Sequence, residues 1–368
     1  MKNLVYLSPV TWTSFAQRPH KFVSWFHQRY GGRVLWVEPY ATRFPTMSDW
    51  RRVQRIRSHG LVGTIPDWLT VLQPASLPIE PLPGSGWVNS RLWRAVLAEV
   101  INFARIDECV LAIGKPSVLA IQVMKALSQC LSIYDAMDDF PAFYSGHSRR
   151  AMKQREKRVI ELADNVWASS TLLYERWRSE HTNVQLVRNG LDIAATSSVD
   201  LVTSDSDKTI FGYLGTIGNW FDWNLILALA QMLPNELIRI VGPVYKPAPE
   251  LLPKNIEMLP PCNHAQAVAH MAQFDIGLIP FMKNELTDSV DPIKYYEYRA
   301  LGLPVLSSDF GEMHYRDKED GVFLVRDIAD LSNVVKLARS AMGARRMNTN
   351  FIEANSWTAR FDETGGLF

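Results

Sequence analysis

Short apolar runs alternate with longer amphipathic stretches along most of this 368-residue chain. In the first half, the apolar runs predict buried strands at residues 4–7, 34–37, 71–72, 109–113, 131–134, 165–168 and 184–186. Helical patterns between them cover residues 21–30, 90–103, 117–128, 148–162 and 171–180. Strands that alternate with helices form parallel sheets covered on both faces, so this half predicts an α/β domain.

A second series of the same kind begins at Thr209. It predicts strands at residues 210–213, 238–241, 256–259, 276–279, 305–306 and 321–325, and helices at 223–232, 264–272, 292–301, 328–342 and in the tail. Residues 194–208 are rich in Ser, Thr and Asp and lack periodicity, which indicates a linker. We therefore expect two Rossmann-like domains, 1–193 and 209–345, facing across a cleft onto which the carboxyl ends of their strands open.

Composition agrees with two cores, since 47% of the residues are hydrophobic. The net charge of +1 gives no general attraction to nucleic acid. Residues 1–60, however, hold ten Lys or Arg against two acids, with Trp12, Trp25, Trp36 and Trp50 between them. This mixture favours an anionic membrane surface or an anionic lipid-linked acceptor, and the alternative is a solvated face spread over several elements.

Three cysteines, Cys109, Cys130 and Cys262, are odd in number and lack the CxxC spacing. They predict neither a disulfide framework nor a zinc site. The start of the chain lacks the pattern of a signal peptide, and no apolar run approaches the ~18 residues of a membrane span. We expect a cytoplasmic protein without metal, at most peripheral on the inner face of the membrane.

The strongest local pattern runs from Asp291 to Pro304 and reads Asp-Pro-Ile-Lys-Tyr-Tyr-Glu-Tyr-Arg-Ala-Leu-Gly-Leu-Pro. Pro292 is suited to open a helix, and the unpaired N–H groups of the first turn form an anion site that includes Lys294. Further along, the Glu297 carboxylate could accept hydrogen bonds from two vicinal hydroxyls. A phosphate with a diol beside it indicates a nucleotide, and above all a nucleotide sugar.

This helix resembles the donor-binding helix of GT-B glycosyltransferases, especially family 4, which ends in Glu-(Ala/Tyr)-x-Ala-x-Gly-x-Pro-Val. A second block, Phe-Gly-Tyr-Leu-Gly-Thr-Ile-Gly-Asn-Trp at residues 211–220, resembles the loop that opens the donor domain in bacterial polysaccharide glycosyltransferases. Gly215 and Gly218 would let a phosphate approach the backbone, with Thr216 and Asn219 beside them. The alternative for this short pattern is a structural turn.

Further blocks recur in the family in the same order, namely Ile-Val-Gly-Pro at 240–243, residues 255–261, Phe-Asp-Ile-Gly-Leu-Ile-Pro at 274–280 and residues 284–287. In the family, the turn that corresponds to Pro261–Asn263 lies against the base. The resemblance covers about residues 1–360. It implies a metal-free GT-B enzyme whose C-terminal helix, within residues 346–368, crosses back to the first domain.

One position departs from the family pattern. Family 4 enzymes carry a Glu-x7-Glu pair whose first acid reaches the donor sugar, but counting back from Glu297 gives Ser289. Asp288 or Asp291 could supply the missing carboxylate, so the family's sugar specificity cannot be carried over. Glu297 itself has a structural alternative, as an acid that complements the helix dipole.

In the first half, Ile-Tyr-Asp-Ala-Met-Asp-Asp-Phe at residues 133–140 places Asp135, Asp138 and Asp139 at the end of a predicted strand. The block resembles the Tyr-Asp-x-Met-Asp-Asp-Phe variant of enzymes in bacterial surface-polysaccharide assembly. Many relatives have a histidine near Met137, which is absent here. Asp138 or Asp139 is the candidate group that deprotonates or orients the acceptor hydroxyl, with Asp135 beside it.

The alternative is that these acids cap the next turn and pair with arginines such as Arg149 or Arg150. A further block, Gln17-Arg-Pro-His20, resembles the same enzymes. It would place Arg18 and His20 toward the acceptor or the diphosphate, with His20 as a catalytic candidate, although a lone histidine is often structural.

The resemblance implies a glycosyltransferase that moves a sugar from a nucleoside diphosphate sugar, with UDP-sugar the expected donor, to a saccharide or lipid-linked acceptor, with retention of configuration. Two alternatives share the fold: a sugar-nucleotide epimerase, whose own His and Glu patterns are not found, and a binding or scaffold protein without turnover. A nicotinamide dehydrogenase is disfavoured because residues 8–16 contain no glycine.

Overall fold

The structure is a computed structural model that describes residues 1–42, 65–77, 80, 85–192, 208–317, 319–343 and 347–365. Contacts divide the chain into two compact units, Met1–Val187 and Arg188–Phe368. The predicted linker at 194–208 lies outside the described residues except for Lys208. The same holds for half of the basic N-terminal residues, namely Arg43, Arg51, Arg52, Arg55 and Arg57.

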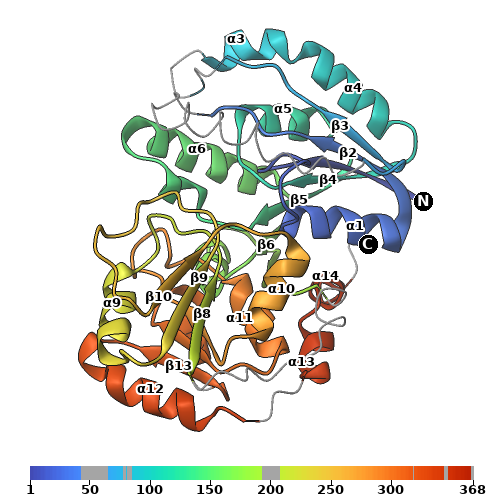
Figure 1. Ribbon diagram of the computed structural model, residues 1–368. Coiled ribbons are helices and arrows are strands. Elements are labelled where there is room, and N and C mark those ends of the chain that lie inside the picture. The colour runs from blue at the N-terminus through green and yellow to red at the C-terminus, as the bar shows by residue number, and fades with distance from the viewer. Residues whose placement is uncertain are drawn as a thin grey trace. The chain divides into compact units, whose positions relative to one another are not determined.

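The first unit is a parallel sheet with helices on both faces (Figure 1). Its strands are β1 (Lys2–Leu7), β2 (Gly31–Val37), β3 (Leu69–Leu72), β4 (Glu108–Ile113), β5 (Leu131–Ala136), β6 (Asn165–Ala168) and β7 (Val184–Leu186). Its helices are α1 (Arg18–Tyr30), α3 (Ser85–Leu92), α4 (Arg94–Ala104), α5 (Val118–Ala126), the 3-10 turn η1 (Phe140–Phe143), α6 (Gly146–Leu162) and α7 (Thr171–Trp177). The strand order β3-β2-β1-β4-β5-β6-β7 reverses between β1 and β4.

The second unit repeats this plan. Its strands are β8 (Ile210–Leu214), β9 (Leu237–Val241), β10 (Ile256–Leu259), β11 (Ile276–Ile279), β12 (Val305–Ser308) and β13 (Val322–Val325). Its helices are α9 (Trp223–Met232), α10 (His264–Ala272), α11 (Ile293–Ala300), η2 (Gly311–Arg316), η3 (Ile328–Asp330), α12 (Leu331–Ser340), α13 (Thr349–Ala354) and α14 (Trp357–Asp362). The order β10-β9-β8-β11-β12-β13 is parallel throughout and reverses between β8 and β11.

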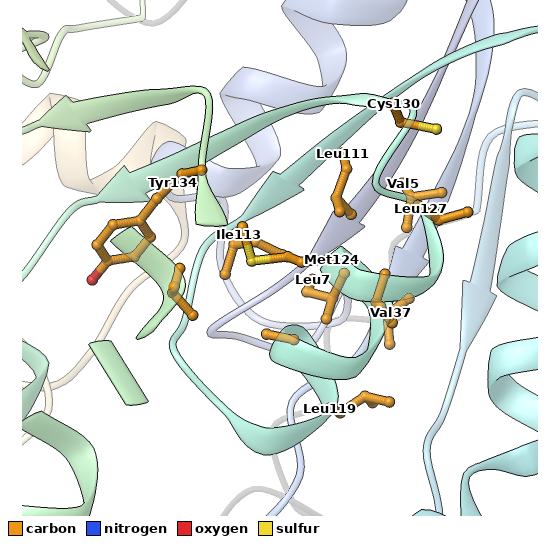
Figure 2. Close-up of a cluster of buried hydrophobic side chains, with 14 of the residues drawn as sticks. Val5, Leu7, Val37, Leu111, Ile113, Leu119, Met124, Leu127, Cys130 and Tyr134 are labelled. Carbon is orange, nitrogen blue, oxygen red and sulfur yellow. The ribbon is translucent and has the colours of Figure 1, made fainter. Parts of the chain in front are cut away.

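The strands form because their apolar runs are buried on both faces of the sheets. Figure 2 shows the core on one face of the first sheet, where Leu7, Val37 and Leu119 pack with side chains from β4, α5 and β5. Two clusters fill the two faces of the second sheet. The predicted α/β class with two Rossmann-like units is confirmed, and so is every predicted strand.

The helix predicted at 90–103 is different, because the structure has two helices, α3 and α4, that meet at Trp93. The Trp93 side chain is completely buried between them. The sequence predicted a later start because Gly86, Val88 and Asn89, which lie within α3, are poor helix formers. At the other end of the chain, α13 packs against α11 within the second unit. Every helix of the described residues is too short or too polar to span a lipid bilayer.

Candidate functional site

The carboxyl end of β5 carries the three acids, and two of them are neutralised by arginines. Arg18, the first residue of α1, points Nε and Nη2 at the Asp135 carboxylate, with Nη2 2.8 Å from Oδ1. Its Nη1 donates to the carbonyl oxygen of Val187 at 2.8 Å. Asp139 forms an ion pair of 2.9 Å with Arg176 of α7. Both partners differ from Arg149 and Arg150, which the sequence suggested.

Asp138 is the acid of this cluster that has no ion pair within the described part of the chain. Burial raises the pKa of its carboxyl to about 7, the nearby Arg18 lowers it, and the charges of Asp135 and Asp139 raise it further. The side chain is half-buried, so it remains in reach of a substrate. A carboxylate that titrates near neutral pH and has no cation of its own is suited to accept a proton.

A second buried acid lies behind the cluster. The Tyr134 hydroxyl donates to Oε1 of Glu156 at 2.8 Å, and the Glu156 side chain is 1% exposed. Burial raises the pKa of Glu156 to about 7. This group was missed in the sequence because it lies on α6 among exposed basic residues, where its helical position alone marks it as inward-facing.

His20 is held by both of its ring nitrogens. Nδ1 accepts a hydrogen bond from the Gln17 amide at 3.2 Å, and Nε2 lies 3.1 Å from the Trp12 carbonyl oxygen, to which it donates. Burial lowers the pKa of His20, which favours this neutral form. Both ring nitrogens therefore have their partners in the segment between β1 and α1, and His20 orders this loop.

In the second unit, α11 begins after Pro292 as the sequence predicted. Lys294 and Glu297 form an ion pair one turn apart on this helix, and both side chains remain partly exposed. The Tyr298 hydroxyl accepts a hydrogen bond from the Leu214 amide at 3.0 Å, so the helix is fastened to the end of β8 just before Gly215. The helix and the glycine loop therefore lie together at the carboxyl edge of this sheet.

The glycine loop is closely packed against the turn after β9. A Cβ on Gly242 would lie 2.1 Å from the carbonyl oxygen of Gly215, and a Cβ on Gly218 would lie 2.7 Å from the Trp220 ring. The Gly215 amide donates to Val241 and the Ile217 amide to Pro243, both at 2.9 Å. Within the described residues no partner takes the amides of Thr216, Gly218 and Asn219, which are thus the donors that a phosphate could use.

The turn that contains Pro261 comes to the same place. Pro261 is exposed, and Asn263 caps α10 by accepting a hydrogen bond from the Gln266 amide at 2.9 Å. Burial raises the pKa of the Cys262 thiol, and the positive charge of Lys294 offsets part of this rise. The turn follows β10 and α11 follows β11, so both begin at the carboxyl edge of the same parallel sheet.

Asp291 is the predicted donor-site residue that the structure uses differently. Its Oδ1 lies 2.7 Å from Nη2 of Arg316, and its Oδ2 accepts hydrogen bonds from the Tyr296 hydroxyl and the Asn189 amide. The side chain is fully buried. Asp291 therefore fixes the start of α11, and of the two acids that flank Ser289 only the half-buried Asp288 is left exposed to a ligand.

Two parallel, doubly wound sheets, each with its predicted site residues at the carboxyl edge, define the GT-B fold. Solved structures agree along the whole chain. HepE from Anabaena in complex with UDP is 15% identical, covers 99% of this chain and 98% of its own, and has a TM-score of 0.63. A glycosyltransferase from Rickettsia africae is 11% identical, covers 98% and 96%, and has a TM-score of 0.65.

A curated relative is similar in sequence as well. The putative teichuronic acid biosynthesis glycosyltransferase TuaH of Bacillus subtilis (strain 168) is 27% identical over 198 residues. The match spans 48% of this chain and about half, 50%, of that protein. No protein-family model matches the chain.

Proposed function

We propose that this protein is a glycosyltransferase that moves a sugar from a nucleoside diphosphate sugar to an acceptor hydroxyl. The observation that carries the proposal is the grouping of Lys294, Glu297, the Thr216, Gly218 and Asn219 amides and the Pro261 turn at the carboxyl edge of the second sheet. A UDP-sugar is the donor we propose, since a structure of the same fold binds UDP. TuaH, the relative in sequence, points to bacterial surface polysaccharide synthesis.

In this proposal the second unit binds the donor. The diphosphate lies against the first turn of α11 and the amides of Thr216, Gly218 and Asn219, with Lys294 as its cation, and Glu297 accepts hydrogen bonds from the ribose hydroxyls. These donors stabilise the negative charge that grows on the leaving diphosphate without a metal ion. Glu297 and Lys294 exchange their mutual ion pair for these contacts when the nucleotide binds.

The first unit binds the acceptor, a saccharide or lipid-linked saccharide. Its hydroxyl oxygen forms the new bond to the anomeric carbon while the bond from that carbon to the diphosphate oxygen breaks. Asp138 accepts the hydrogen bond of this hydroxyl and takes its proton, and UDP leaves with the bonding electrons. We propose retention of configuration on the resemblance to family 4; it requires that the hydroxyl attacks from the face of the sugar that the diphosphate leaves, and NMR of the product's anomeric carbon tests it.

Titration calorimetry with UDP-, GDP-, dTDP- and CMP-sugars and their free nucleotides tests the donor site first. We expect one base to bind, loss of its binding in Glu297→Ala, and unchanged binding in Glu250→Ala, which removes an exposed acid of the same unit. If none of these nucleotides or nucleotide sugars binds, the proposed donor site is rejected. Product analysis then separates transfer from epimerisation.

A binding protein without turnover is the second candidate. The observation that favours it is the buried Ser289 in place of the first family acid, next to the fully paired Asp291. A nucleotide sugar that binds, but is neither transferred to any saccharide nor hydrolysed, would favour this candidate over the enzyme.

We also propose action on the cytoplasmic side of the membrane, with peripheral contact through the basic N-terminal region. Of the tryptophans that suggested this contact, Trp25 and Trp36 belong to the core. Arg18 is buried as well, so the proposal now depends on the exposed Arg29 and Arg33 and on residues beyond those described. Flotation with anionic and neutral vesicles tests it, and equal binding to both would contradict it.

A further inference from the structure

The turn after β9 is fastened to the glycine loop, residues 215–219, through its main chain. β8 and β9 are neighbouring parallel strands (Figure 1), and a bridge between Ile217 and Val244 continues their pairing beyond the ends of both strands. The amides of Tyr245 and Lys246 then donate to the Ile217 carbonyl oxygen at 2.9 and 3.1 Å. Lys246 is therefore held beside the glycine loop by backbone hydrogen bonds.

The glycine loop is itself fixed in a way that leaves hydrogen-bond donors over. The Tyr213 hydroxyl donates to the Thr216 carbonyl oxygen at 2.9 Å, and the Phe221 amide donates to the Gly218 carbonyl oxygen at 3.2 Å. The amides of Thr216, Gly218 and Asn219 have no partner within the described part of the chain. Main-chain N–H groups held in a fixed turn are suited to bind an anion.

These amides carry no full charge, and the loop supplies none. Residues 211–221 contain no Lys or Arg, and the next residue, Asp222, adds a negative charge at the start of α9. On α11, the charge of Lys294 is balanced by Glu297. The phosphates of a nucleotide would therefore be matched in charge only if another cation lies beside the loop.

Lys246 is suited to supply this charge. Its side chain is exposed, and it has no ion pair with any residue that the structure describes. Its flexible four-carbon stem starts next to Ile217, which lies between two of the free amides. Lys283 is a second exposed lysine near the loop, because the Met282 amide donates to the Trp220 carbonyl oxygen at 2.7 Å. That contact lies beyond the free amides, so Lys246 is the better placed of the two.

We propose that Lys246 binds the diphosphate of the donor together with the free amides of the glycine loop, as a second cation besides Lys294. The inference rests on the proposed function in calling the ligand a nucleotide. It adds a residue that the sequence did not single out, which selects for the second phosphate and stabilises the charge of the leaving diphosphate.

Calorimetry on the full chain with UDP, UMP and inorganic pyrophosphate tests the inference. We expect a preference for UDP over UMP that falls about tenfold in Lys246→Gln, the effect of one charge-assisted hydrogen bond. Lys246→Arg should keep the preference, because it keeps the charge. Lys254→Gln is the matched control, because this exposed lysine precedes β10 and so lies at the opposite, amino edge of the same sheet.

An unchanged preference in Lys246→Gln would overturn the inference and leave the donor site standing. Loss of the preference in Lys283→Gln instead would overturn it in favour of Lys283. Pyrophosphate that binds through Lys246, with no binding of UDP, would keep the anion site and reject the nucleotide donor, whereas no binding of either would reject both. Protection of Lys246 from reductive methylation by UDP gives the same comparison on the unsubstituted protein, and equal methylation with and without bound UDP would contradict the contact.

Discussion

The Nη2 atom of Arg18 lies 2.8 Å from Oδ1 of Asp135, and each of these side chains is only 1% exposed. This ion pair joins the start of α1 to the end of β5, and a further bond from Arg18 reaches Val187 at the end of the first unit. Three separate segments thus meet around one guanidinium, at the edge that carries Asp138. Arg18 and Asp135, predicted as ligands for acceptor or phosphate, have each other as partners.

Arg18→Met should lower the free energy of unfolding by about 3–5 kcal/mol, because it leaves the Asp135 carboxylate buried without its cation. Urea unfolding measures this loss. Arg18→Met combined with Asp135→Leu removes both charges and should recover most of the stability. Arg33→Met, at an exposed arginine of the same unit, is the control. An unchanged unfolding midpoint in Arg18→Met would assign Arg18 to a ligand instead.

Asp138→Asn should lower kcat about 10²-fold or more while the donor affinity stays the same, because it removes the proton acceptor alone. In the unsubstituted protein the rate should rise with pH through about 7, where the Asp138 carboxyl loses its proton. Transfer assays from pH 5.5 to 8.5, with Asp67→Asn as an exposed control, measure both effects. Full activity of Asp138→Asn would show that Asp138 is not the proton acceptor.

Glu156→Gln tests the second buried acid through stability. Its pKa is raised from 4.5 to about 7, so between these values the folded state binds more protons than the unfolded state. The free energy of unfolding therefore falls as pH rises across this window. Thermal unfolding from pH 4.5 to 8 should show a smaller decline in Glu156→Gln, whereas Glu161→Gln, at an exposed residue of the same helix, should show the same decline as the unsubstituted protein. An unchanged decline in Glu156→Gln would contradict the raised pKa of Glu156.

The sequence predicted the sheets well because each strand is a short apolar run bounded by turn residues. It also placed α11, since Pro292 and Gly302 mark its two ends. It could not predict the partners of the acids, because Arg316 lies 25 residues from Asp291 and Arg176 lies 37 residues from Asp139. The folded sheet decides which acids have an arginine partner. The sequence alone therefore could not show that Asp138 has none among the described residues.

Glu297→Gln should remove the discrimination between UDP and 2′-deoxy-UDP. If the Glu297 carboxylate accepts the ribose hydroxyls, the unsubstituted protein prefers UDP by about tenfold or more, and the variant binds both nucleotides alike. Calorimetry gives the four dissociation constants. Glu250→Gln should keep the preference. A preference that persists in Glu297→Gln would leave Glu297 as the partner of Lys294 and nothing more.

Arg316→Met should show that Asp291 positions α11 rather than binding the sugar. Arg316 bonds to Asp291 and to the Tyr296 hydroxyl, both at 2.7 Å, so its loss leaves a buried carboxylate unpaired and should cost about 3–5 kcal/mol of stability. Because the whole helix shifts, the affinities for UDP and for different UDP-sugars should fall by the same factor. Asp291→Asn should act in the same uniform way in calorimetry. If it instead changes the order of preference among UDP-sugars while the urea midpoint stays constant, then Asp291 is the missing family acid.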